Sequence, residues 1–80
     1  MKREISFFNK KVHFIGIAGA GMVALAQYLR SFGRCKISGS DLTISKAVKD
    51  LEIQGVEIFK GHHENQVKPA DIVVYSSAIP

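Results

Sequence analysis

The sequence predicts an α/β fold, a small parallel sheet of about four strands with helices on both faces. Short apolar stretches alternate with segments whose apolar residues recur at helical spacing, and the connections between them are short. The first apolar stretch also runs into a glycine-rich turn that opens directly into a helix. This β-α-β-α-β-turn-β order is typical of a Rossmann-like domain, which we expect over residues 11–80.

The first half of the domain contains two strands and one helix. Residues 11–15 predict a buried strand, and His13 is the one polar residue in its apolar run over 12–15. The helix begins at Gly21, and Gly33 is placed as its C-cap. A second strand spans residues 35–38 and is closed by 39–41. The residues expected to form the apolar face of the helix are Met22, Leu25, Ala26, Leu29 and Phe32.

The second half of the domain contains another helix and two more strands. A helix begins near Ser45, with Ser45 or Thr43 as its N-cap, and ends at Gly55. Strands follow at residues 56–59 and 71–75, separated by a polar turn or one short helical piece over 62–67. The residues expected to face the sheet from this second helix are Ala47, Val48, Leu51 and Ile53. Residues 1–10 lie outside the pattern as an appended segment, either packed on the domain edge or disordered.

Composition excludes several classes of protein. The chain has 80 residues, one cysteine and a net charge of +4 with scattered basic residues, so a disulfide framework and nucleic-acid binding are not expected. No apolar run reaches the roughly 18 residues that span a membrane, and a charged N-terminus argues against a secretory signal. We therefore expect a cytoplasmic protein that binds no membrane.

The turn after the first strand has the features of a phosphate-binding loop. Gly16 is placed to make a tight turn and Gly21 to allow close packing of helix on sheet. The strict dinucleotide pattern requires a middle glycine where Ala18 stands, and Gly19 is available to replace it. Asp41 follows Gly21 by twenty residues, a spacing suited to an acid that binds a ribose hydroxyl. Spacing alone favours NAD as the ligand, against the alternative of a glycine turn that only joins strand to helix.

The stretch His-Phe-Ile-Gly-Ile-Ala-Gly-Ala-Gly-Met at residues 13–22 is followed by further motifs in a fixed order, at residues 38–42, 55–56, 58–59, 61–62 and 70–80. Together these motifs resemble the N-terminal domain of the Mur ligases, and within that family the branch that adds L-alanine to UDP-N-acetylmuramate. The resemblance extends over nearly all of residues 11–80. The family usually has two adjacent glycines at positions 18 and 19, so Ala18 is a departure from its pattern.

The resemblance implies that the domain holds the UDP part of UDP-N-acetylmuramate and no nicotinamide. Backbone N–H groups of Gly19, Ala20 and Gly21 would contact the diphosphate, and Ser40 and Asp41 would lie beside the ribose and uracil. His62 would reach the nucleotide from the loop after the third strand. The full set of implied substrate contacts is Gly16, Ala18, Gly19, Ala20, Gly21, Met22, Ser40, Asp41, His62, Ser76, Ser77 and Ala78.

The resemblance also implies an ATP-dependent ligase of peptidoglycan synthesis. In that family ATP phosphorylates the lactyl carboxylate, the amine attacks the acyl phosphate, and Mg²⁺ balances phosphate charge. This chain has no G-x-x-x-x-G-K-[ST] pattern, so we expect ATP and Mg²⁺ to bind in other domains of a longer protein. The chain alone is then expected to hold no catalytic residue or cofactor, and to contact the remaining ligase domains.

Three alternatives remain open at this level. They are the ligase that recycles murein tripeptide onto UDP-N-acetylmuramate, a regulatory NAD-binding module, and a structural domain with a vestigial loop. The last strand would be a bare edge, which suggests a continuing chain or a weak homodimer.

The other reactive side chains receive simpler roles. Adjacent His62 and His63 predict no metal site, and His13 is expected to be partly buried and hydrogen-bonded. Cys35 is expected to be a small buried hydrophobe, and Asp71 to serve in a turn or cap. The Ser76-Ser77 pair lacks a base and an acid partner and is not expected to supply a nucleophile.

Overall fold

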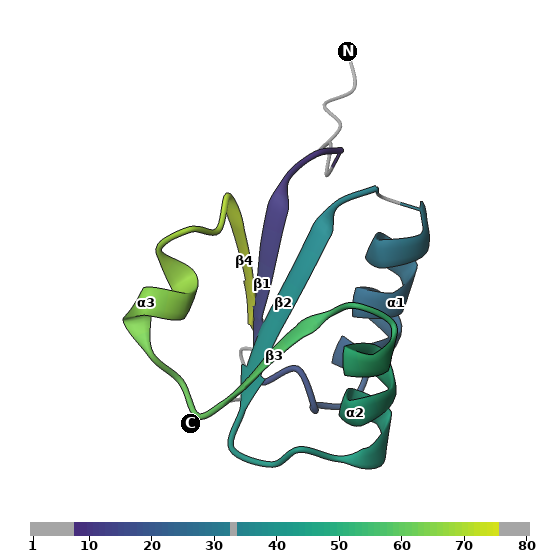
Figure 1. Cartoon of the computed structure of the whole chain (residues 1–80), viewed down its shortest axis with the longest axis vertical. Coiled ribbons are helices and arrows are strands. Elements are labelled where there is room, and N and C mark those ends of the chain that lie inside the picture. Colours follow the sequence, from purple (N-terminus) through teal and green to yellow (C-terminus); the bar gives the residue numbers. More distant parts are fainter. Residues whose placement is uncertain (1–7, 33, 76–80) are drawn as a thin grey trace.

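The computed structural model describes residues 8–32 and 34–75. Its described strands form one four-stranded sheet in which every neighbouring pair is parallel, in the order β3-β2-β1-β4 (Figure 1). This confirms the predicted fold class, and β4 lies at one edge of the described sheet. The strands are β1 (Lys11–Ile15), β2 (Lys36–Asp41), β3 (Glu57–Lys60) and β4 (Ile72–Tyr75).

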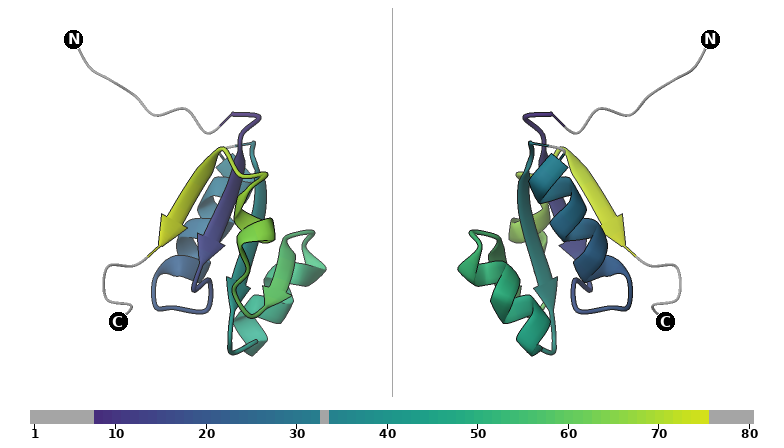
Figure 2. Two further views of the ribbon diagram at one scale, coloured as in Figure 1. Left: turned by 90° about the vertical axis from the view of Figure 1, so that its left-hand side faces the viewer. Right: turned by 90° about the vertical axis from the view of Figure 1, so that its right-hand side faces the viewer.

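Three described helices connect the strands. α1 (Met22–Phe32) and α2 (Lys46–Ile53) lie on one face of the sheet, and the short α3 (Glu64–Val67) lies on the other (Figures 1 and 2). The chain moves outward from β1 through β2 to β3 and then returns past β2 and β1 to β4. Because parallel crossovers keep one hand, this reversal of direction places α3 on the face opposite to α1 and α2.

The core lies between the sheet and the helices α1 and α2. Phe14, Ile17, Val48 and Leu51 are fully enclosed there. Within α1, the residues that face the core are Met22, Ala26 and Leu29, spaced by four and three positions.

The predicted apolar faces of α1 and α2 are wrong at four positions, which are Leu25, Phe32, Ala47 and Ile53, because all four are exposed. Leu25 is 40% exposed, Phe32 75% and Ile53 84%. Leu25 and Phe32 lie to one side of the buried stripe of α1, where Phe32 instead packs on Tyr28 with ring centroids 5.2 Å apart. Ile53 is the last residue of α2, and the two residues after it are exposed as well.

Other boundaries differ from expectation by a few residues. β2 continues through Gly39, Ser40 and Asp41, which were expected to close it, because Gly39 and Ser40 pair with both β1 and β3 and Asp41 pairs with β3. β3 and β4 each begin one residue later than predicted. Ser45 is confirmed as the N-cap of α2, since its Oγ accepts the Val48 N–H at 3.3 Å.

Some predictions lie outside the described residues. They concern the cap at Gly33, the first seven residues of the appended segment, and the contacts of Ser76, Ser77 and Ala78. Over the ranges that are described, no helix is long and apolar enough to cross a membrane.

Candidate functional site

Three loops meet at the carboxyl edge of the sheet. They follow β1, β2 and β3, and backbone hydrogen bonds join them: the Gly16 N–H donates to the Ser40 carbonyl at 2.8 Å, and the Gly61 N–H donates to the Asp41 carbonyl at 2.8 Å. In open parallel α/β sheets, ligands bind at this edge. The candidate site is therefore built from residues 16–22, 40–43 and 61–62.

The glycine-rich loop turns sharply at two positions. Gly16 and Gly21 have φ of 80° and 81°, values that favour glycine. Between them the Gly19 N–H donates to the Gly16 carbonyl at 2.9 Å, and the Met22 N–H donates to the Gly19 carbonyl at 3.0 Å. Within the described part of the chain, the N–H groups of Ala20 and Gly21 have no hydrogen-bond acceptor. Two donors at the start of an eleven-residue helix suit an anionic ligand.

Ala18 is tied to the end of β2. Its N–H donates to Asp41 Oδ2 at 2.9 Å, while the Thr43 N–H donates to Asp41 Oδ1 at 3.0 Å. Among the described residues other than glycine, a positive φ occurs only at Asn9 and Arg34, so Ala18 holds a backbone conformation that suits its methyl group. The side chain of Ala18 is half-buried against the core.

Asp41 thus supports the loop as well as facing the site. The two N–H donors occupy one lone pair on each carboxylate oxygen, and each oxygen has a second lone pair available to a ribose hydroxyl. The role in nucleotide binding predicted for Asp41 stays a prediction.

A chain of four polar side chains runs from the sheet into the loop after β3. Ser38 Oγ lies 2.7 Å from His13 Nδ1, and His13 Nε2 lies 3.3 Å from Ser40 Oγ. Ser40 Oγ in turn lies 2.7 Å from Nδ1 of His62. His13 and Ser40 are each only 1% exposed, whereas His62 is exposed. The predicted hydrogen-bonded histidine in β1 is confirmed, and its burial is complete.

Burial determines the protonation of His13. Removal from water lowers the pKa of His13, the nearby His62 lowers it further, and Glu57 opposes both effects. The ring is therefore neutral at pH 7 and carries one N–H. Phe59 lies beside it, with ring centroids 6.4 Å apart.

The two adjacent histidines have different partners. His62 contacts Ser40 in the sheet, while His63 caps α3 by accepting the Asn65 N–H on Nδ1 at 3.3 Å. The backbone N–H of His63 donates to the side chain of Gln66, which completes a capping box. In the ranges that the structure describes, no group of three metal-ligating side chains lies together.

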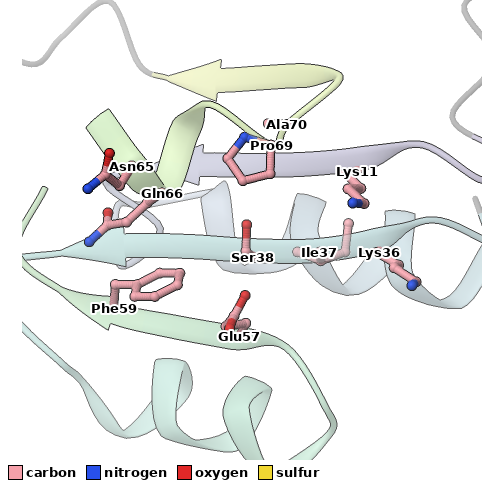
Figure 3. Close-up of a pocket in the computed structure, with 10 residues that line it drawn as sticks. All are labelled: Lys11, Lys36, Ile37, Ser38, Glu57, Phe59, Asn65, Gln66, Pro69 and Ala70. Atoms are coloured by element: carbon pink, nitrogen blue, oxygen red, sulfur yellow. The ribbon is translucent and has the colours of Figure 1, made fainter. Parts of the chain in front are cut away.

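A separate pocket of about 220 Å³ opens on the sheet face that carries α3. Figure 3 shows Ser38 between Glu57 and Phe59 of β3 on one side and Pro69 and Ala70 on the other. The remaining lining residues are Lys11, Lys36, Ile37, Asn65 and Gln66. Ser38 therefore borders this pocket while its hydroxyl contacts His13.

Sequence reasoning missed two contributors to the site. The first is Ser38, although its register opposite His13 follows once the two strands are aligned. The second is Gly39, where an added Cβ would lie 2.4 Å from Ile17 Cδ1 and 2.8 Å from Ile17 Cβ. The absence of a side chain at Gly39 lets the glycine-rich loop pack directly on β2.

Cys35 and Asp71 have structural roles, although Cys35 is less buried than expected. Cys35 is half-buried, its thiol donates to the Leu29 carbonyl at 3.3 Å, and burial raises its pKa. Asp71 Oδ2 accepts the Lys11 N–H at 2.8 Å, and the Asp71 N–H donates to the Lys11 carbonyl at 2.8 Å. These paired bonds fix the start of β4 beside the start of β1.

The fold defines the class of the protein: a parallel α/β, Rossmann-like domain with a glycine-rich loop between its first strand and its first helix. Residues 11–80 match the Mur ligase family, catalytic domain, and the chain belongs to that family.

Two curated relatives are UDP-N-acetylmuramate–L-alanine ligases. The chain is 50% identical over 72 residues to the UDP-N-acetylmuramate–L-alanine ligase of Clostridium novyi (strain NT), covering 90% of this chain and 16% of that protein. It is 46% identical over 80 residues to the enzyme of that name from Clostridium acetobutylicum, covering 100% and 17% respectively. The chain thus spans about a sixth of the length of these relatives.

Solved structures share the fold. SirC, a precorrin-2 dehydrogenase, aligns with a TM-score of 0.77 at 13% identity, over 95% of this chain and 38% of its own. The PH0520 protein of Pyrococcus horikoshii OT3 aligns with a TM-score of 0.69 at 28% identity, over 100% and 22% respectively.

Proposed function

We propose that this chain is the substrate-anchoring domain of an ATP-dependent ligase that adds L-alanine to UDP-N-acetylmuramate in peptidoglycan synthesis. The relatives bearing that enzyme's name, at 46–50% identity, support this proposal. The observation that carries it is that the N–H groups of Ala20 and Gly21, which have no acceptor among the described residues, lie at the same edge of the sheet as Asp41 and His62. We also propose that the chain is located in the cytoplasm.

The diphosphate is placed at the start of α1. The N–H groups of Ala20 and Gly21 and the positive end of the helix dipole would neutralise part of its charge. The ribose and uracil would then lie toward Ser40, Asp41 and His62. Ser76, Ser77 and Ala78, which lie outside the described residues, would complete the substrate contacts together with Gly16, Gly19 and Met22.

The role of such a domain is to position its substrate. Binding the remote UDP group holds the lactyl carboxylate near the ATP site, and orientation of this kind lowers a barrier by several kcal/mol. In this proposal ATP and Mg²⁺ are held by domains outside this chain, as expected from its lack of a P-loop pattern. The chain alone would bind substrate and show no turnover.

The test is an NMR titration of the ¹⁵N-labelled chain with UDP-N-acetylmuramate, UDP and NAD in parallel. We expect the uridine ligands alone to shift the amide signals of Ala20, Gly21, Asp41 and His62. A response to NAD without one to UDP would favour the regulatory module instead. Silence toward all three would contradict the proposal. The ligase that recycles murein tripeptide uses the same first substrate, so this titration does not distinguish it from the alanine-adding ligase. The two functions are distinguished by whether the longer protein couples L-alanine or the tripeptide.

A further inference from the structure

The polar chain from Ser38 to His62 constrains where each proton lies. A serine hydroxyl has one proton and accepts at its oxygen, and a neutral imidazole has one N–H and one acceptor nitrogen. Ser40 is buried between two histidine nitrogens, so its single proton goes to one of them and its oxygen accepts from the other. Two donors to Ser40 would leave a buried hydroxyl proton unpaired, which costs about 1–3 kcal/mol.

Two directions of hydrogen bonding along the four side chains meet this requirement. In the first, Ser38 donates to His13 Nδ1, His13 Nε2–H donates to Ser40, and Ser40 donates to His62 Nδ1. In the second, every donor and acceptor is exchanged.

The distances favour the first direction. Hydroxyl donors make shorter hydrogen bonds than N–H donors. Both 2.7 Å contacts have the hydroxyl as donor in the first direction, and the 3.3 Å contact has the ring N–H as donor. The second direction would assign the long contact to a hydroxyl and the two short ones to ring N–H groups.

We propose that Ser38 and His13 are positioning residues that act through Ser40 and fix His62 as an Nε2–H donor for an acceptor oxygen of the bound uridine nucleotide. When Ser40 donates to Nδ1 of His62, that nitrogen carries no proton, and the ring N–H lies on Nε2, on the other side of the ring. No described residue is hydrogen-bonded to that nitrogen. His13 is enclosed in the sheet and Ser38 borders the pocket under α3, so both act through Ser40. The ligand part of this inference rests on the proposed function.

The first experiment reads the tautomers directly without a ligand. Long-range ¹H–¹⁵N spectra of the histidine rings separate protonated from unprotonated nitrogens at pH 7.5. We expect an unprotonated Nδ1 and a protonated Nε2 on both His13 and His62. A protonated Nδ1 on His62 would overturn the proposal.

Variants at Ser38 test the coupling. Ser38 lies at the border of a pocket, so Ser38→Ala removes the hydroxyl and Ser38→Thr keeps it with room for one methyl group. We expect Ser38→Ala to move the His62 Nδ1 signal toward the protonated value and Ser38→Thr to restore it. We call the hydrogen-bonded series from Ser38 through His13 and Ser40 to His62 the relay. If the amide spectrum shows that Ser38→Ala is folded and its His62 Nδ1 signal is unchanged, the relay is overturned.

Binding of UDP measures the consequence. We expect Ser38→Ala to weaken UDP binding about threefold to tenfold, the equivalent of about one hydrogen bond. The same change in a His62→Ala background should cost nothing further, whereas an equal loss there would contradict coupling through His62. His63→Asn, which keeps a capping side chain, is the matched control and should bind like the unaltered chain. If the unaltered chain binds no UDP, the proposed function fails, and the ring spectra still decide the relay.

Discussion

The carboxylate of Asp41 accepts the backbone N–H of Ala18 at 2.9 Å, which ties the end of β2 to the glycine-rich loop after β1. The Ser40 carbonyl adds two bonds to the same loop, from the Gly16 and Ile17 N–H groups at 2.8 and 3.1 Å. These three bonds place the donors of Ala20 and Gly21 relative to β2. An acid at this position therefore shapes the glycine-rich loop, whether or not it also contacts a ligand.

Replacing Asp41 should affect stability and binding together. Asp41→Ala leaves the Ala18 N–H without its acceptor, and we expect a loss of about 1–3 kcal/mol in the free energy of unfolding. UDP binding should weaken as well, since the loop is no longer held. Urea unfolding and a UDP titration measure the two effects. Asp50→Ala in α2 removes an acid outside the loop and serves as control. Full stability in Asp41→Ala would show that the bond is dispensable.

Restoring the family's glycine at position 18 should give no gain. The backbone of Ala18 is not left-handed and its methyl is half-buried against the core. Ala18→Gly therefore increases the conformational entropy of the unfolded chain and removes a packed methyl group. We expect a loss of about 0.4–1 kcal/mol in the free energy of unfolding. Affinity for UDP should stay the same or fall. A clear increase in affinity, measured by titration, would mean that the methyl restricts the loop.

Gly39 should tolerate no side chain. A Cβ there would lie 2.4 Å from Ile17 Cδ1, so Gly39→Ala forces the loop away from β2. We expect a cost of about 1–3 kcal/mol in stability and shifted amide signals at Ile17 and Ala18. The double variant Gly39→Ala with Ile17→Ala should cost less than the sum of its parts. Strictly additive costs in urea unfolding would contradict a direct clash.

The sequence predicts the architecture because the period of its apolar residues changes cleanly between strands and helices. It places β1, α1 and the N-cap Ser45 correctly for that reason. It ends β2 too early because glycine, serine and aspartate resemble a turn when read locally. Their strand conformation comes from pairing with β1 and β3, which no local pattern contains.

The site is predicted in part for the same reason. The glycine-rich loop and Asp41 stand out by spacing, and the structure joins them through Ala18. The relay through Ser38 depends on the register of two strands 25 residues apart, so the sequence marks His13 only as a polar residue in an apolar strand. Exposure of Phe32 and Ile53 likewise depends on how the helices lie on the sheet.

The burial of His13 predicts a pH-dependent stability. Removal from water lowers its pKa in the folded protein, His62 lowers it further, and Glu57 opposes them, while the unfolded chain protonates at the ordinary value of about 6.5. Stability from His13 is therefore complete above pH 6.5 and falls as the pH drops below it, because the unfolded state binds the proton more tightly. The slope for one such group is at most about 1.4 kcal/mol per pH unit. Urea unfolding of the unaltered chain and of His13→Asn at pH 7.5, 6.0 and 5.0 separates the contribution of His13 from that of the other titrating groups. Equal slopes in the two proteins would show that His13 takes up its proton without loss of stability.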